Sequence, residues 1–463
     1  MFKKLHYLIL LFSITAFISC DSKSKSAATY FGGKIINPKS NFVILYSMEK
    51  VIDTLFLKKD NKFLGKLKDA KEGLYYFVHG NENQYIYIEP QDSLMLRLNT
   101  WDFDESIVYA GKGAERNNIL NDCFLEDEKD NKKFYQLNKL EPKEFQQEMD
   151  ALLKFKEQTY NEFVLNHPEE TSGFKNVLNV ALTYPIFARI ERYPIAHVKY
   201  SNKKDFHNLN DSFYKHRKTA SINNDSLMYY PPYSQFVINY LYNKTYIKGH
   251  KPMTYEYSSS FTEDLLKTIN ENITSTKTKN TLLKQTVIGH FYRKSSCNIN
   301  KDAFNTYFDL SSDTKDKDHI RQLLVDNKNL HGGQKLSNFN INDLNESTHS
   351  IKTIIKNKNT FLFFWNPNFV SPIYIESRIN FLSQKFPDIQ FVLVKIDGDS
   401  NSKIDKLDIK NQYYITSKSE ANSFLTSKLP RSIIINKKGI VTNGFASISS
   451  RKVHTELKNL SKQ

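Results

Sequence analysis

The spacing of hydrophobic and polar positions changes along the chain and separates three kinds of segment. Between residues 30 and 110, turn residues divide short runs of β-branched and aromatic residues, as in "FVILYSM" (42–48) and "QYIYIEP" (84–90). Short strands at this spacing are typical of a sandwich or a small barrel. The pattern therefore predicts an N-terminal all-β, sandwich-like domain at residues 30–113.

Residues 114–330 instead follow the three- to four-residue period of amphipathic helices. In the stretch 143–167 the apolar residues recur at such steps or at their multiples: Phe145, Met149, Leu152, Tyr160 and Phe163. Apolar residues at this period share one face of a helix. Prolines punctuate the region and no internal repeat is found, so we predict a helical middle region.

Residues 331–463 combine the two patterns. "TFLFFW" (360–365) is a continuous apolar run, which is typical of a central strand covered on both faces. An amphipathic stretch follows, then a second apolar run in "IQFVLVKIDGDS" (389–400) and a strand with a hairpin in "LPRSIIINKKGIV" (429–441). A last helical stretch closes the chain. The pattern predicts a C-terminal α/β module, which makes the protein multidomain.

This order of elements resembles the thioredoxin-like module of the TlpA type, a family of envelope thiol:disulfide interchange proteins. Phe364 and Trp365 match the start of the family's F-W-A-x-W-C-x-x-C pattern, and Pro430 matches its proline beside the active site. The resemblance implies a thioredoxin-like fold at residues 331–463. It also implies that the peptide bond before Pro430 is cis, an isomer that is uncommon in folded proteins.

The two cysteines of that pattern are replaced. Their positions fall on Phe369 and Pro372, in the turn "NPNFVSP" (366–372). Disulfide exchange requires an attacking thiolate and a second thiol at close range, and neither side chain supplies one. The resemblance therefore implies a redox-inactive module without catalytic residues, and it favours a role other than that of an enzyme.

A module that no longer exchanges thiols can still bind a ligand. Thioredoxins hold extended peptides by strand addition beside the proline. By analogy we expect a peptide or an envelope protein as the partner, bound or scaffolded by Trp365, Phe369, Pro430 and Arg431. The analogy rests on the fold, which does not set function by itself.

The N-terminus indicates an export signal. After "MFKK", the apolar run "LHYLILLFSITAFIS" (5–19) has the length of a signal peptide. It ends at "FISC", which resembles a lipoprotein signal of the Bacteroidetes type, although Phe17 departs from the usual Leu. The resemblance implies cleavage after residues 1–19, acylation of Cys20 and a flexible tether at residues 20–29.

These features lead us to expect a lipid bilayer as a partner of acylated Cys20. The expected location is the cell envelope, on the outer membrane and facing the periplasm. An ordinary cleaved signal with an incidental cysteine is the alternative interpretation.

Two other functions remain open. Cys123 and Cys297 lack CxxC spacing and are expected to be small buried apolar residues, but either one could serve a thiol:disulfide oxidoreductase. The aromatic cluster at residues 228–246 could stack on sugars through Tyr229 and Tyr233 in a glycan-binding accessory lipoprotein. The alternative for this cluster is a helix that packs in a core.

Charge and motif spacing exclude several further classes. The chain of 463 residues has 65 Lys and Arg against 50 Asp and Glu, a net charge of +15. Charges of both signs alternate, as in "EDEKDNKK" (126–133), so we expect a solvated surface and no nucleic-acid partner. "GKGAERN" (111–117) lacks the P-loop spacing and predicts a turn before a helix. No HExxH or tight His and Cys cluster occurs, so no metal or cofactor is predicted.

Overall fold

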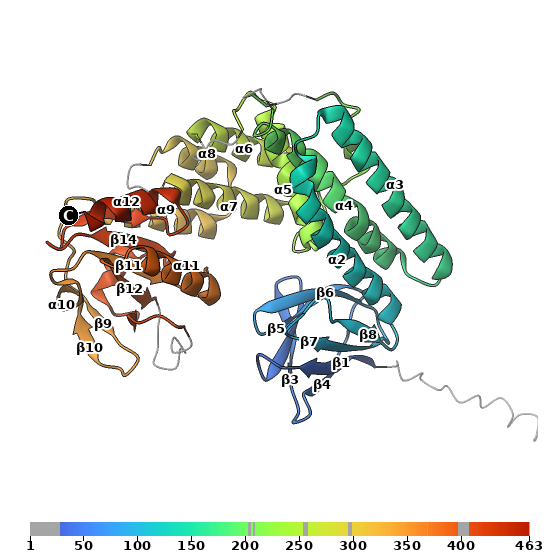
Figure 1. Ribbon diagram of the computed structural model, residues 1–463, viewed down its shortest axis with the longest axis horizontal. Helices are drawn as coiled ribbons and strands as arrows, with labels where there is room; N and C mark the ends of the chain where they lie inside the picture. The colour runs from blue at the N-terminus through green and yellow to red at the C-terminus, as the bar shows by residue number, and fades with distance from the viewer. Residues whose placement is uncertain are drawn as a thin grey trace, which may run out of the picture. The chain divides into compact units, whose positions relative to one another are not determined.

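The computed structural model describes residues 28–201, 205–206, 209–252, 258–294, 299–367, 369–396 and 407–462. Contacts divide the chain into two compact units (Figure 1). The first unit runs to Glu191 and includes Phe213–Ala220 and Ser226–Val237; the second comprises Arg192–Ser212, Ser221–Asp225 and Ile238–Gln463. Residues 1–19, which the sequence predicts to be a signal peptide, and Cys20 lie outside the described residues.

The first unit begins with two four-stranded sheets, in the orders β4-β1-β7-β8 and β3-β2-β5-β6. Among the described strands of these two sheets, only β1 and β7 pair in parallel. Both sheets contribute to one core, in which Phe31, Val43, Phe77 and Leu94 are buried. The strands predicted between residues 30 and 110 are therefore present. Their bounds are β1 Thr29–Ile36, β2 Phe42–Ser47, β3 Lys50–Phe56, β4 Lys62–Leu67, β5 Gly73–His79, β6 Glu82–Ile88, β7 Ser93–Asn99 and β8 Val108–Ala110.

Helices follow the strands, as the apolar period predicts. Pro142 occupies the first turn of α3, where its missing N–H removes no intrahelical hydrogen bond. Asp313 caps α9 by accepting a hydrogen bond from the Asp316 amide at 2.8 Å. The helices are α2 Ala114–Leu137, α3 Pro142–Asn166, α4 Ser172–His197, α5 Pro231–Tyr246, α6 Ser259–Asn272, α7 Thr276–Lys294, α8 Asp302–Leu310 and α9 Thr314–Asn329.

A seven-stranded sheet in the order β10-β9-β13-β12-β11-β14-β15 forms the centre of the C-terminal module. β12 lies parallel to β11, whereas β14 runs antiparallel to β11. The strands are β9 Asn340–Asn342, β10 Thr348–Ser350, β11 Thr360–Trp365, β12 Gln390–Lys395, β13 Gln412–Tyr414, β14 Arg431–Ile435 and β15 Val441–Ala446. The helices are α10 Ile351–Ile355, α11 Pro372–Lys385 and α12 Arg451–Ser461.

β11 is buried along its whole length, which explains its continuous apolar sequence. Leu362 and Phe364 belong to one core cluster. Phe361, Phe363 and Trp365 belong to the other, which α11 and α12 cover. Because successive side chains of a strand point to opposite faces, a strand with two covered faces needs apolar residues at every position.

Contacts within the second unit continue across residue 330, where the sequence predicted a domain boundary. Phe291 of α7 packs edge-to-face on Phe445 of β15, with ring centroids 4.6 Å apart. Asp326 of α9 is buried and accepts hydrogen bonds from Thr426 and Ser427. The helices α7 and α9 therefore pack directly on the C-terminal module. The domain bounds predicted from the sequence stay predictions.

No helix in the described part of the chain is both long and apolar enough to cross a membrane.

Candidate functional site

The turn after β11 places Phe369 at the surface and keeps Trp365 inside. The amides of Phe369 and Val370 both donate to the Asn366 carbonyl, at 3.0 and 3.2 Å, which closes the turn. α11 then begins at Pro372, another proline in a first helical turn. The Phe369 side chain stays 47% exposed, whereas Trp365 packs in the core beneath α11.

β14 brings a serine, rather than the predicted arginine, next to this turn. Ser432 pairs with Phe363 of β11, on the face covered by α11 and α12. Arg431 points to the opposite face, because neighbouring residues of a strand alternate. Its guanidinium is buried and donates to the carbonyls of Gly444 and Asp326, at 2.7 and 2.9 Å. Arg431 therefore connects β14 to β15 and α9 inside the fold through these hydrogen bonds, and it does not line the surface where we predicted it.

The peptide bond before Pro430 is trans, so the predicted cis isomer is wrong. No peptide bond among the described residues is cis. The trans form is the default for X–Pro bonds by about 0.5–1 kcal/mol, and only the resemblance implied the other isomer. Instead, Tyr292 of α7 donates its hydroxyl to the Pro430 carbonyl at 2.7 Å. Burial raises the pKa of Tyr292 above its usual value, which keeps this donor protonated.

α7 and α9 supply the side of the site that the sequence did not reveal. Lys284, Ile288 and Tyr292 are spaced by four residues, so they share one face of α7. His319 of α9 donates Nε2–H to the Ser427 carbonyl at 2.9 Å, and its ring lies 5.9 Å from that of Phe369. The four-residue spacing could have identified an amphipathic face, but not the surface that this face covers.

These elements line a cavity of about 700 Å³ that is open to solvent on one side. This volume lies within the usual range of small-molecule sites. Most of its walls are apolar, formed by Ile288, Tyr292, Phe363, Phe369, Val370, Tyr374, Leu429, Pro430, Ala446 and Ile448. Of the residues predicted from the sequence, Phe369 and Pro430 line the cavity, whereas Trp365, Pro372 and Arg431 do not.

The lining of this cavity includes four serine hydroxyls and several basic side chains, and its described groups that carry a formal charge share one sign. Lys284, Arg293 and Lys452 line it together with His319, and none of the described lining residues is an Asp or a Glu. Lys284 also pairs with Asp316, at 2.6 Å. The cavity is therefore apolar with cationic groups in its lining.

No described cysteine is among the residues that line this cavity. Cys123 lies on α2 in the first unit and is buried. Burial raises its pKa to about 12, so the thiolate is scarce at neutral pH. Cys297 lies outside the described residues.

Two tyrosines of the aromatic cluster at residues 228–246 pack inside the first unit. Tyr233 is buried and stacks on Tyr184, with ring centroids 5.6 Å apart. Tyr229 is half-buried, and its hydroxyl donates to the Leu74 carbonyl. Both rings therefore make contacts inside the protein, which agrees with the alternative that this segment is a helix packed in a core.

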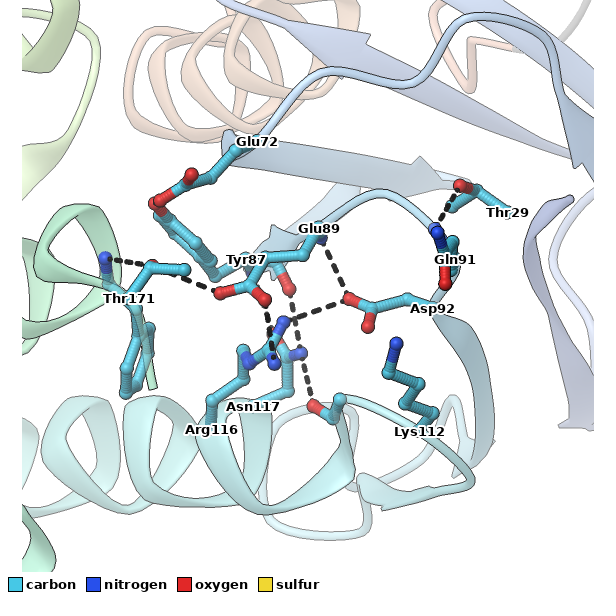
Figure 2. Close-up of polar contacts among 12 residues, drawn as sticks. Thr29, Glu72, Tyr87, Glu89, Gln91, Asp92, Lys112, Arg116, Asn117 and Thr171 are labelled. Carbon is cyan, nitrogen blue, oxygen red and sulfur yellow. Dashed lines mark hydrogen bonds and ion pairs between the residues drawn. The ribbon is translucent and has the colours of Figure 1, made fainter. Parts of the chain in front are cut away.

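A second polar cluster joins α2 to the β6–β7 turn. Figure 2 shows Arg116 reaching from α2 toward Glu89 and Asp92, with which it pairs at 3.1 and 3.0 Å. Glu170 completes the set at 2.9 Å, and all four side chains are largely buried. The segment "GKGAERN" is a turn before α2, as predicted. Because carboxylates surround Arg116, this turn is unsuited to phosphate.

Burial raises the pKa values of Asp92 and Glu170, and Arg116 opposes that rise. Within the described residues, no group of three or more His, Cys, Asp or Glu side chains could hold a metal ion. We therefore interpret the cluster around Arg116 as structural: its ion pairs connect α2 to the β6–β7 turn.

Comparisons with known proteins find similar solved structures for part of the chain. No family model and no curated protein matches it. Among solved structures, a proposed thiol-disulfide oxidoreductase from Bacteroides vulgatus is 22% identical, with a TM-score of 0.25 over 28% of this chain and 97% of that one. A proposed thiol:disulfide interchange protein DsbE from Chlorobium tepidum is 15% identical, with a TM-score of 0.25 over 28% and 99%.

The C-terminal domain of a proposed thiol-disulfide oxidoreductase from Bacteroides thetaiotaomicron is 17% identical, with a TM-score of 0.25 over 28% of this chain and 97% of that one. Each of these neighbours is described as a thiol-disulfide oxidoreductase or interchange protein, and each match covers about 28% of this chain.

Proposed function

We propose that this protein is a binding protein rather than a thiol enzyme, and that its C-terminal module holds apolar groups of a ligand in the cavity beside Phe369 and Pro430. The cavity itself carries the proposal. It is closed mainly by apolar side chains and has the volume of a ligand site. Phe369 and Pro372 occupy the positions at which the resemblance would place the two thiols, so the site has no group that can exchange disulfides.

The ligand implied by the resemblance is a peptide or a segment of an envelope protein. Strand addition beside Pro430 would use main-chain groups of the loop. Tyr292 already occupies the Pro430 carbonyl, which leaves one acceptor fewer for such pairing. The cavity supports a ligand that inserts apolar side chains or an apolar chain between α7 and β14.

Binding can be measured with N-phenyl-1-naphthylamine, an uncharged probe that becomes fluorescent in apolar sites. We expect saturable binding to the purified chain. Phe369→Asp should weaken it at least tenfold, because the variant places a carboxylate against apolar walls. A parallel titration with eight-residue peptides, rich in Leu or in Ser, tests whether apolar side chains are accepted.

Phe381 provides a matched control. It lies on α11, is 49% exposed and does not line the cavity, whereas Phe369 is 47% exposed and does. Phe381→Asp should therefore leave probe binding unchanged. Absence of saturable binding, or equal losses in both variants, would refute the proposal.

We further propose that Cys20 is acylated and anchors the chain to an envelope membrane, on the outer membrane facing the periplasm. The support is the apolar run at residues 5–19 followed by "FISC". Cys20→Ala should move the protein from the membrane to the soluble fraction of the envelope and abolish labelling by a palmitate analogue. Retention of both properties would exclude an anchor on Cys20.

No observation favours the two alternatives. The buried Cys123 would not supply a thiolate, and Tyr233 is packed against Tyr184. A disulfide-reduction assay of the parent chain beside a Cys123→Ser/Cys297→Ser variant decides the redox alternative. Activity that disappears in the variant would establish it and contradict our proposal.

A further inference from the structure

The charges around the cavity indicate more than an apolar ligand. Lys284, Arg293 and Lys452 come from two different helices, α7 and α12, and contribute cations to one lining. No described acidic residue lines the same space. A cavity with this asymmetry has a positive potential and attracts an anionic group.

A buried hydroxyl adds an independent indication of a polar ligand atom. Ser432 lines the cavity, is 1% exposed, and its Oγ has no hydrogen-bond partner in the described structure. An unpaired buried hydroxyl is costly, and a ligand atom that bonds to it removes that cost. The cavity therefore offers apolar walls, a cationic lining and one hydroxyl without a partner.

A polar groove of about 470 Å³ lies next to the cavity and shares Lys284 and His319 with it. Thr314, Lys315, Asp316, Asp318 and Gln322 form the rest of the groove. An apolar space that adjoins a polar one suits a molecule with an apolar chain and a polar head. Asp316 pairs with Lys284, the cation that the cavity and the groove share.

We infer that the cavity binds a single-chain anionic amphiphile, an unbranched hydrocarbon chain ending in a carboxylate. The chain would lie against walls such as Phe363, Phe369 and Ile448, and the carboxylate would interact with the lining cations. This inference rests on the proposed binding function and specifies its ligand. It commits to a free carboxylate and not to the headgroup of a membrane phospholipid or to a peptide.

Head-group charge is the decisive variable. Dodecanoate, dodecanol and dodecylamine have the same chain length and can displace N-phenyl-1-naphthylamine from the full purified chain, at concentrations below micelle formation. We expect dodecanoate to bind about tenfold more tightly than dodecanol, since a few partly exposed ion pairs each contribute modestly. Dodecylamine should bind most weakly. Raising the salt concentration should weaken dodecanoate and leave dodecanol unchanged.

Two lysines of α12 form a matched pair of variants. Lys452 lines the cavity, whereas Lys458 is exposed on the same helix and does not. Lys452→Met should bring the affinity ratio of dodecanoate to dodecanol toward one, and Lys458→Met should leave it unchanged. Lengthening the carboxylate from eight to fourteen carbons should raise affinity two- to fourfold per methylene until the cavity is full.

The outcomes separate this inference from the proposed function. If the probe binds but the three head groups compete equally, the cavity is an apolar site and the anionic ligand is refuted. If only Leu-rich peptides displace the probe, or if the chain binds only vesicles of anionic phosphatidylglycerol, the ligand is of another class and the inference is again overturned. If the probe itself does not bind, the proposed function fails first.

Discussion

The carboxylate of Asp326, near the end of α9, holds the loop that leads into Pro430. Asp326 is 1% exposed, and one of its oxygens accepts from the Thr426 amide and hydroxyl, both at 2.7 Å. The other oxygen accepts from the Ser427 amide at 2.9 Å and its hydroxyl at 2.7 Å. Asp326→Asn keeps the size of the side chain but leaves only one oxygen. The new amide group would face the Ser427 N–H, so two donors would meet.

The cost follows from these contacts. A hydrogen bond to a charged acceptor contributes about 1.5–3 kcal/mol, and a buried donor left without a partner costs about 1–3 kcal/mol. The variant loses the bond from the Ser427 amide and turns the bonds from Thr426 into neutral ones. Partial relaxation of the loop offsets some of this loss. We expect the free energy of unfolding of the second unit to fall by about 3 kcal/mol.

The chain's two tryptophans allow this unit to be observed alone. Trp365 is 3% exposed in the second unit, and Trp101 is 73% exposed in the first. In a Trp101→Phe background, the fluorescence of Trp365 reports urea unfolding of the second unit. Asp318→Asn is the control, because Asp318 lies on the same helix with an exposed carboxylate and should change stability by less than about 0.5 kcal/mol.

Probe binding should weaken in Asp326→Asn as well, because the loop carries Leu429 and Pro430 of the cavity wall. An unfolding free energy within about 1 kcal/mol of the parent would refute the role assigned to this carboxylate.

Three further predictions follow from buried or replaced groups. Burial raises the pKa of Asp104 to about 6, above its unfolded value, so the protein loses stability as the pH rises from about 4 through 6. Asp104→Asn should therefore raise the free energy of unfolding by on the order of 1 kcal/mol at pH 7.5. If parent and variant show the same dependence of unfolding free energy on pH, the prediction is wrong. Cys123 should react with iodoacetamide at least 100-fold more slowly in the native than in the unfolded chain, by peptide mass spectrometry; native labelling at the unfolded rate would show an accessible thiol. Phe369→Cys/Pro372→Cys should reduce the small substrate hydroxyethyl disulfide but reduce insulin poorly. If the variant reduces insulin as fast as it reduces hydroxyethyl disulfide, the argument that α7 restricts access of proteins to this site is wrong.

The sequence was informative where local pattern determines structure. The apolar run of β11 predicted a strand buried on both faces, and the structure places it inside the sheet, between β12 and β14. The resemblance also indicated that Phe369 and Pro430 belong to one site, and both line the cavity. Each of these inferences depends on residues that are close in sequence or on an order of elements.

Contacts between distant segments could not be predicted in this way. Tyr292 donates to Pro430 across 138 positions, and nothing in the four-residue spacing on α7 identifies that partner. Arg431 was misplaced for a different reason. Both faces of β14 are buried, so its sequence shows no alternation that would assign Arg431 to one face and Ser432 to the other.

The contact between Tyr292 and Pro430 bears on which ligands can reach the cavity. A protein disulfide can be exchanged only if its sulfur reaches the nucleophile, and strand addition to the loop beside the proline would hold such a substrate in place. Here α7 lies over that loop, and Tyr292 takes its carbonyl. A folded substrate would have to displace the helix, whereas a single chain can enter a space of about 700 Å³. A thiol at Phe369 would thus face a cavity with mainly apolar walls, which suits retention of a small apolar ligand better than exchange with a protein.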